Sequence, residues 1–339
     1  MNRPDVTIVV CTYNRSNLLR GVLESLFRQE TNNELTYEIV VVDNASSDDT
    51  QDVLERLALE SPVPFRVALE TSQGVAFARN RGIDEARGEW IYYIDDDEIA
   101  SSDCVRNMFL FAREKSIRVV GGGVEVQLPD SCPPENRAVY QLLLSHTKTD
   151  TQPFRLHSKR GTGTGNLMLH RSVFDEIGVF DESLAQASED SNLMHRIYDA
   201  EIEGWFTPSS TVYHLVDDYR ISPAYTKWVA KRHGWNLANE DYRRRGACYL
   251  ITRCLARLAQ MTIVNFPKYA IGSLTSSPMV KLLTQFKISR SIAYVRGSAR
   301  LLAPTIFPQQ AYADSLDFRT ERETFSGQGN QEEHQQLTT

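Results

Sequence analysis

The chain has 339 residues, of which 41% are hydrophobic and 24% are charged, and this composition is typical of a globular protein with one or two domains. The formal net charge of −7 argues against a general nucleic-acid-binding protein. The five cysteines are widely spaced and form no Cys-x-x-Cys pair, so they indicate neither a zinc site nor a disulfide framework and fit a reducing cytoplasm. We expect no signal peptide, and no uncharged apolar run reaches the ~18 residues of a membrane-spanning helix.

Apolar strands alternate with amphipathic helices through the first hundred residues. Short apolar runs predict strands at 6–11, 38–42, 65–69 and 90–94, and helical spacing of apolar residues predicts helices from Ser16, near Thr50 and over 75–86. This β-α-β-α-β-α-β order predicts an α/β protein with a doubly wound sheet and right-handed crossovers.

Polar residues follow each of these strands. They are residues 12–15 (Thr-Tyr-Asn-Arg), Asp43, residues 72–74 and residues 95–97. Ligands of doubly wound sheets bind at the carboxyl ends of the strands, so this edge is the expected binding site. No Gly-x-Gly-x-x-Gly sequence follows the first strand and no Walker A sequence occurs, which argues against a dinucleotide-binding or P-loop protein.

The strand at 90–94 ends in Asp95-Asp96-Asp97-Glu98. Three adjacent aspartates cannot all be buried and ionised without a counter-charge. Carboxylate oxygens suit Mg²⁺ or Mn²⁺, and such ions commonly keep coordination positions for substrate phosphates. The pattern therefore favours a divalent cation, and the alternative is a solvated acidic turn that caps the next helix.

The middle of the chain has a weaker pattern. We expect two strands joined by a glycine turn over 118–126, an irregular segment over 127–160, and a glycine-rich loop at 161–165 that is either simply flexible or in contact with substrate phosphates. Further on, we expect a strand at 166–170, a short helix at 172–177, a helix from 188 to about 200 and a strand at 212–214.

Three residues of this region are candidates for a site. Glu189 and Asp190 open the helix at 188–200, and His214 ends the last strand. Taken alone, the two carboxylates are equally well explained as helix caps, because the helix dipole favours acids at a helix start. A lone histidine is more often structural than a metal ligand.

The segment from 242 to 313 contains eleven Lys or Arg residues and no Asp or Glu. Apolar residues are interleaved with these cations. A basic, amphipathic, acid-free segment is typical of a helix that lies on an anionic membrane surface. The alternative is a helical pair that packs on the acidic remainder of the chain. Residues 314–339 are polar and predict a disordered tail.

With these pieces placed, the chain resembles the family 2 glycosyltransferases of the GT-A fold over about residues 5–215. Five motifs in family order carry the resemblance: residues 9–15 (Val-Val-Cys-Thr-Tyr-Asn-Arg), residues 41–48 (Val-Val-Asp-Asn-Ala-Ser-Ser-Asp), residues 74–82 with Ala78-Arg79-Asn80, residues 94–97 (Ile-Asp-Asp-Asp) and Glu189-Asp190. The resemblance implies a mixed sheet with a Rossmann-like nucleotide-binding half and an acceptor half, followed here by a basic α-helical region.

The resemblance also implies a role for each matched residue. On the donor side, the implied nucleotide-binding residues are Thr12, Tyr13, Arg15, Asp43, Gly74, Arg79, Asp95 and Asp96, with Asp43 accepting a hydrogen bond from the base. The implied metal ligands are Asp95, Asp97 and His214, and Asp190, beside Glu189, is the implied catalytic base. The chain departs from the family at Asn192 and Ser72, where relatives often carry an acid and an asparagine.

The resulting hypothesis is an inverting, metal-dependent glycosyltransferase. It would move a sugar from a nucleotide donor, a UDP-sugar by resemblance, to a glycan or lipid-linked acceptor in surface polysaccharide or exopolysaccharide synthesis. Inversion follows from a single base that faces the leaving group across the sugar. Two alternatives stay open. One is a sugar-nucleotide nucleotidyltransferase, which would need a glycine-rich basic loop after the first strand that this chain lacks. The other is an inactive glycan- or membrane-binding relic.

We expect three regions along the chain. They are a catalytic domain at 1–220, a basic helical region at 221–313 and the tail at 314–339. The expected location is the cytoplasm, peripheral on the cytoplasmic face of the plasma membrane, and no nucleic-acid partner is expected.

Overall fold

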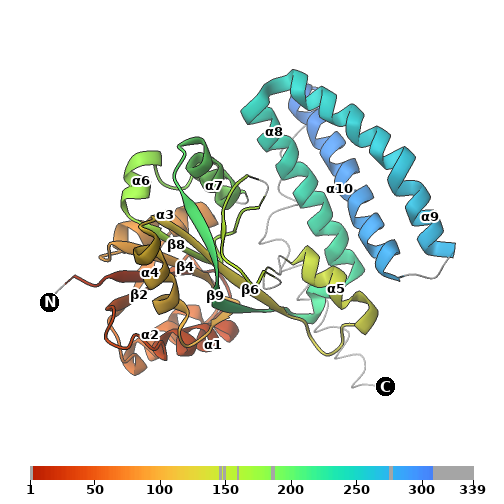
Figure 1. The fold of residues 1–339 in the computed structure, drawn as a ribbon. Coiled ribbons are helices and arrows are strands. Elements are labelled where there is room, and N and C mark those ends of the chain that lie inside the picture. The colour runs from red at the N-terminus through yellow and green to blue at the C-terminus, as the bar shows by residue number, and fades with distance from the viewer. Residues whose placement is uncertain are drawn as a thin grey trace. The chain divides into compact units, whose positions relative to one another are not determined.

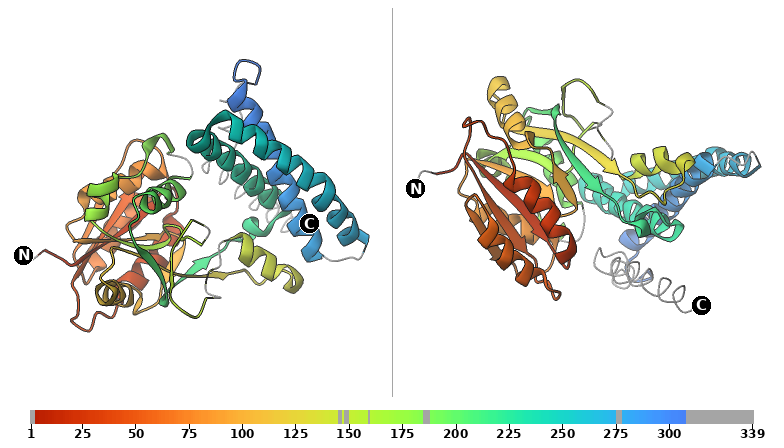
Figure 2. Two further views of the ribbon diagram at one scale, coloured as in Figure 1. Left: turned by 45° about the horizontal axis from the view of Figure 1, so that its top comes forward. Right: turned by 90° about the horizontal axis from the view of Figure 1, so that it is seen from below.

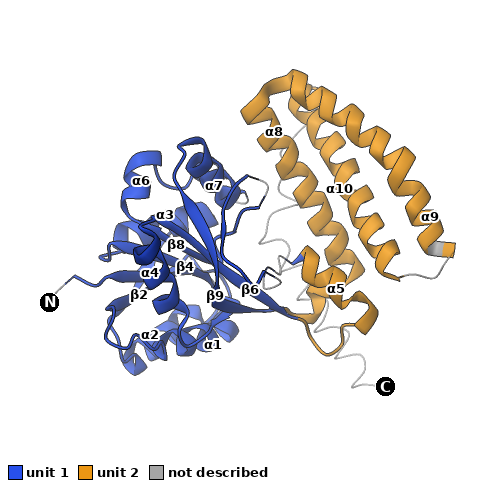
Figure 3. Cartoon of the chain, in the orientation of Figure 1, with its two compact units in different colours: residues 1–127, 144–215 blue, residues 128–143, 216–339 orange. Residues whose placement is uncertain are grey.

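A computed structural model describes residues 3–144, 147, 150–158, 160–184, 188–274 and 278–307. The chain divides into two compact units (Figure 3), one of residues 1–127 and 144–215 and the other of residues 128–143 and 216–339. The first unit is thus built around the sheet, and the second consists of helices. The tail predicted for 314–339 lies outside the described residues.

The first unit contains a mixed sheet (Figure 1). Its strand order is β3-β2-β1-β4-β8-β6-β9-β5, with β7 paired to β9. The strands are β1 (Val6–Thr12), β2 (Tyr37–Asp43), β3 (Phe65–Leu69), β4 (Trp90–Asp95), β5 (Glu98–Ala100), β6 (Val119–Gln127), β7 (Phe154–Arg155), β8 (Asn166–His170) and β9 (Gly204–Leu215). Strands β3, β2, β1 and β4 are parallel, whereas β8 runs antiparallel to β4 and β6. The predicted fold class is confirmed.

Alternate residues of the central strands enter two separate cores. Ile8 and Val10 of β1 pack in one core with α1 (Ser16–Phe27), α2 (Thr50–Glu60) and α4 (Cys104–Lys115). Val9 of β1 packs in the other core with α3 (Val75–Glu85), α6 (Ser172–Ile177) and α7 (Glu189–Asp199). A short 3-10 helix (Glu182–Leu184) precedes α7. Because a strand shows successive side chains to opposite faces, the continuous apolar runs in the sequence are explained by helices on both faces.

Three predictions for the middle of the chain differ from the structure. Residues 118–126 do not make two strands around a turn, because β6 is one strand with a register shift between Gly122 and Gly123. Gly122 allows the side chain of Asn166 on β8 to lie against the backbone of β6, since a Cβ atom on Gly122 would be 2.3 Å from the side-chain amide nitrogen of Asn166. The strand predicted at 212–214 is the end of the longer β9, and the segment predicted as irregular contains α5 (Pro134–Leu143) and β7.

The second unit is helical. It comprises α5, a 3-10 turn (Asp218–Ile221), α8 (Pro223–Gln260), a π turn (Met261–Asn265), α9 (Phe266–Leu274) and α10 (Pro278–Leu302). Gly246 has a φ of +75° and divides α8 into two helices, and the chain reverses direction near this residue (Figures 1 and 2). Tyr294 lies at the centre of this unit, with Ala238 and Leu250 beside it, and its hydroxyl donates to Asp241 at 2.7 Å.

Close packing in this unit depends on small residues. A Cβ atom on Gly234 would lie 2.3 Å from the backbone oxygen of Arg290, and one on Gly297 would lie 2.8 Å from the ring of Trp235. The first half of α8 therefore lies almost directly against α10. The helical C-terminal region predicted from the sequence is confirmed.

Candidate functional site

The carboxyl ends of three neighbouring parallel strands bring the first candidate residues together. Thr12 at the end of β1 is in register with Asp43 of β2, and Cys11 is in register with Asp95 of β4. The strand order places β1 between β2 and β4. The edge expected to bind a ligand is therefore a continuous row of polar groups from Asp43 to Asp95.

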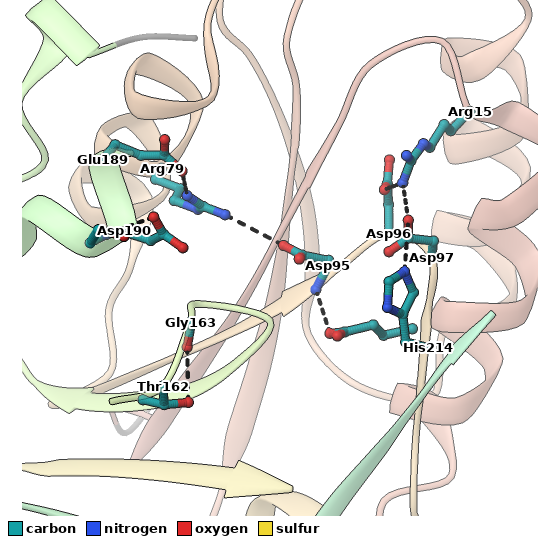
Figure 4. Close-up of polar contacts among 12 residues, drawn as sticks. Arg15, Arg79, Asp95, Asp96, Asp97, Thr162, Gly163, Glu189, Asp190 and His214 are labelled. Atoms are coloured by element: carbon teal, nitrogen blue, oxygen red, sulfur yellow. Dashed lines mark hydrogen bonds and ion pairs between the residues drawn. The ribbon is translucent and has the colours of Figure 1, made fainter. Parts of the chain in front are cut away.

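One arginine holds two of the adjacent aspartates (Figure 4). Arg15 donates a hydrogen bond to Asp96 and another to Asp97, the second at 2.8 Å, and all three side chains are buried. The hydroxyl of Thr12 donates to Asp96 at 2.9 Å. Arg15 thus supplies the counter-charge that two buried carboxylates require. In this state, Thr12, Arg15 and Asp96 are engaged with one another.

His214 lies beside Asp97, 117 residues earlier in the chain. Strand β9 pairs with β5 so that His214 is opposite Glu98, and the amide of Leu215 donates to the carbonyl of Asp97 at 2.9 Å. This pairing leaves the Nε2 atom of His214 3.6 Å from the Oδ2 atom of Asp97. The imidazole nitrogen of His214 and the carboxylate of Asp97 therefore lie close enough together to be two ligands of one metal ion.

Asp95 differs from the two aspartates that follow it. Its side chain is 49% exposed, its Oδ1 atom is 3.5 Å from Arg79, and its amide donates to Glu98 at 3.1 Å. Glu98 was not singled out from the sequence, yet it is buried at the centre of the acidic turn. Burial, followed by the charge of Asp95, raises the pKa of Glu98 well above its usual value, so its neutral form is favoured.

Arg79 links this edge of the sheet to helix α7. Its guanidinium donates to Glu189 and is 3.5 Å from Asp95 (Figure 4). Burial opposes the charged guanidinium, but the charges of Glu189 and Asp95 outweigh it and raise the pKa of Arg79 above its ordinary value. Glu189 is buried in this ion pair, so its carboxylate fixes the start of α7.

Asp190, the next residue, takes no part in that ion pair (Figure 4). Its Oδ1 atom accepts from the amide of Ser191 at 2.6 Å. Its Oδ2 atom would be 3.6 Å from a Cβ atom on Gly163, so the glycine-rich loop at 161–165 passes beside Asp190. Gly165 of the same loop lies against Glu98, where a Cβ atom would be 2.6 Å from a carboxylate oxygen. The loop therefore runs between the acidic turn and α7.

The remaining nucleotide-side candidates lie around the end of β2. Asp43 is buried and accepts from the amide of Ser46 at 3.0 Å. Asn44, which the sequence showed only as part of a motif, accepts from the amide of Gly74 at 2.8 Å and donates to the carbonyl of Ser72 at 2.8 Å. Asn44 thus fixes the loop before α3, while Tyr13 is half-buried beside Thr12.

Comparison with known proteins agrees with this fold. The family model "Glycosyl transferase family 2" matches residues 7–178, just over half of the chain. The mannosyltransferase PcManGT from Pyrobaculum calidifontis, solved in complex with GDP-Man and Mn²⁺, is similar in fold, with a TM-score of 0.59 over 88% of each chain and 19% identity.

Two curated relatives come from Rhizobium meliloti. Succinoglycan biosynthesis protein ExoO is 39% identical over 105 residues, which are 31% of this chain and 29% of ExoO. Succinoglycan biosynthesis protein ExoM is 27% identical over 252 residues, which are 71% of this chain and 78% of ExoM.

The mixed sheet and its likeness to PcManGT show that the first unit has a GT-A-like fold. The chain belongs to glycosyl transferase family 2. The expectation of a glycosyltransferase enzyme is confirmed at the level of the family.

Proposed function

We propose that the chain transfers a sugar from a nucleoside-diphosphate donor to an acceptor hydroxyl, with inversion at the anomeric carbon and dependence on a divalent metal ion. The observation that carries the proposal is the Asp95–Arg79–Glu189 chain of ion pairs, which connects the acidic turn to the residue before Asp190. A donor side and a base side are thereby held in one rigid arrangement, as in-line displacement requires.

The residues on the donor side fit a nucleotide. We propose that Thr12, Tyr13 and Asp43 surround the base, because they end two adjacent parallel strands. Arg15, Gly74, Arg79, Asp95 and Asp96 would complete the nucleotide site. Since Arg15 is already paired with Asp96 and Asp97, binding of a diphosphate would exchange part of this ion-pair network for contacts with phosphate oxygens.

The acidic turn also fits a divalent cation. No group of three or more potential metal ligands is assembled among the residues that the structure describes, but Asp97 and His214 are adjacent and Asp95 is half-exposed nearby. Mg²⁺ and Mn²⁺ sites commonly use one or two carboxylates and take the remaining ligands from phosphates and water. We therefore propose Asp95, Asp97 and His214 as ligands. When bound, the ion would neutralise the charge of the leaving diphosphate.

Asp190 is the proposed catalytic base. Glu189 is committed to Arg79, whereas the Oδ2 atom of Asp190 makes no hydrogen bond within the described part of the chain. Asp190 would take the proton of the acceptor hydroxyl as that oxygen attacks the anomeric carbon and the bond to the diphosphate oxygen breaks on the opposite face. Because one base is used and no covalent intermediate forms, the configuration inverts.

The setting is proposed from the relatives. ExoO and ExoM carry names of succinoglycan biosynthesis, and the match covers only 29% of ExoO. We propose a role in surface polysaccharide or exopolysaccharide synthesis, with a UDP-sugar as donor and a glycan or lipid-linked sugar as acceptor. An enzyme with a lipid-linked acceptor would work at the cytoplasmic face of the plasma membrane.

Nucleotide binding is tested first by thermal unfolding with a panel of nucleoside diphosphates, each with and without Mn²⁺. One nucleotide should raise the melting temperature, and the rise should depend on the metal. Asp97→Asn should abolish the metal-dependent part, while Asp175→Asn, an exposed acid on α6, should not. If no nucleotide in the panel raised the melting temperature, the proposal would be contradicted.

Catalysis is then tested with Asp190→Asn. This variant should keep the nucleotide-induced shift but release nucleoside diphosphate from the sugar donor at least about a hundredfold more slowly, because general base catalysis contributes roughly 10²–10⁴-fold. Near-normal turnover in Asp190→Asn would remove Asp190 from the mechanism.

A further inference from the structure

The helical segment 247–274 exposes more apolar surface than its packing against α10 explains. Its residues with exposed large apolar side chains are Ile251, Leu255, Leu258, Ile263, Val264, Phe266, Ile271 and Leu274. The side chain of Leu255 is 64% exposed and that of Ile263 is 74% exposed. Exposed apolar residues gathered on one helix mark an interaction surface more often than chance scatter does.

Four of these residues line up along the segment, and we call Ile251, Leu255, Leu258 and Phe266 the apolar stripe. The first three are spaced by four and three residues, which is one face of an α-helix. Eight residues separate Leu258 from Phe266, and a regular α-helix would place their side chains about 80° apart. The π turn between them corrects this, because the amide of Phe266 bonds to the carbonyl of Met261, five residues back.

The charges around the stripe are mostly positive, and Asp241, which lies 3.9 Å from Arg253, is an exception among the residues that the structure describes there. Residues 242–307 contain eleven Lys or Arg and no Asp or Glu. Arg253 and Lys268 lie on the same helical segment as the stripe, and Arg243, Arg244 and Arg245 precede its first residue. A second copy of this face would bring like charges together, whereas an anionic surface would be attracted to it.

We propose that the segment 247–274 docks along the surface of an anionic phospholipid bilayer, with the apolar stripe at the boundary between headgroups and acyl chains. One 18-residue window of the helix Pro223–Gly272 has a mean hydropathy of 1.2 and is only 11% buried, so it could by length and composition also cross a membrane. Arg253 and Lys268 lie toward the two ends of the segment, and this favours a helix that lies flat. This inference does not rest on the proposed reaction.

The test is co-sedimentation of the full chain with vesicles of phosphatidylglycerol and phosphatidylcholine, compared with phosphatidylcholine alone. The protein should bind the anionic vesicles, and binding should weaken as salt is raised. Leu255→Gln combined with Ile251→Gln should weaken binding by at least about tenfold, because both side chains belong to the apolar stripe and are exposed. Lys268→Gln should weaken it by about fivefold, as expected for one cation near an anionic surface.

Leu59→Gln is the matched control, since Leu59 is an 89% exposed leucine on α2 of the other unit and should leave vesicle binding unchanged. All variants should keep the melting temperature of the parent protein, because the substituted side chains are exposed. Failure to bind anionic vesicles would overturn the proposal. It would also be overturned if the chain formed a dimer without lipid and only the Leu255/Ile251 variant lost it, because the stripe would then be covered by a second copy.

Discussion

The buried ion pair between Arg79 and Glu189 permits a quantitative test of how the base-bearing helix is held. Glu189→Gln keeps the shape of the side chain and a hydrogen-bond acceptor but removes its charge. The buried guanidinium would then retain Asp95, which is half-exposed and 3.5 Å away, and the weaker attraction of Asp190. Breaking a buried ion pair from one side costs about 3–5 kcal/mol, and the remaining acceptor and Asp95 place the expected loss near the lower end, at about 3 kcal/mol.

Thermal unfolding of the variant measures this loss. In a domain of roughly 150–250 residues, 1 kcal/mol shifts the melting temperature by about 2–4 °C, so Glu189→Gln should lower that of the first unit by about 6–12 °C. Glu85→Gln is the control, because Glu85 forms a partly exposed pair with Arg81 at 2.7 Å. Such surface pairs are worth about 0.2–1 kcal/mol, which predicts a decrease of at most a few degrees.

A double-mutant cycle separates the ion pair from other effects of substitution. Arg79→Met and Glu189→Met should each be strongly destabilising, and the double variant should lose less stability than the sum of the two, because neither charge is then left buried alone. A decrease below about 2 °C for Glu189→Gln, or strict additivity in the cycle, would show that the pair does not hold α7 in place.

Two further predictions concern the sheet. Gly122→Ala should destabilise the protein by about 1–3 kcal/mol, because its Cβ atom would lie 2.3 Å from the side-chain amide of Asn166, which is held by Tyr92 and the carbonyl of Gly123. Gly123→Ala is the control and should be nearly neutral, since the nearest neighbour of its Cβ atom is 3.5 Å away. Equal melting temperatures for the two variants would refute this prediction. Burial raises the pKa of the Cys104 thiol from 9.0 to about 11, so between these pH values the folded chain keeps a proton that the unfolded chain loses. The free energy of unfolding should therefore fall as the pH rises from about 9 to 11. At pH 8, iodoacetamide should label the exposed Cys248 well before the buried Cys104, and equal labelling rates in the folded protein would contradict the burial.

Local pattern was sufficient for the parallel half of the sheet. Strands β1, β2 and β4 are short, mostly apolar and buried, and each ends in a polar residue, Thr12, Asp43 or Asp95. The alternation of strands and helices then fixes which strand ends lie together. For this reason the edge from Asp43 to Asp95 could be expected without a structure.

The elements that the sequence did not indicate have a mixed local signal. Strand β9 contains Thr207-Pro208-Ser209-Ser210 in its middle, which reads as a turn, but Thr207 and Ser210 are buried where β6 shifts its register. The prolines of 129–134 suggested irregular chain, although Pro134 occupies the first position of α5, where proline is favourable. Helix α4 went unassigned, and it completes the core on the α1 face of the sheet.

The role of Glu189 shows what local pattern cannot supply. By local pattern alone, Glu189 and Asp190 are two acids at a helix start that could both be caps, and only the family resemblance marked Asp190 as the base. Their difference comes from Arg79, which is 110 residues away and selects one of them by an ion pair. The same arginine also lies beside Asp95, so it contacts both acidic motifs at once. Under the proposed mechanism, a change at Asp95 on donor binding would reach the start of α7 through this guanidinium, and the position of Asp190 would then depend on the donor edge.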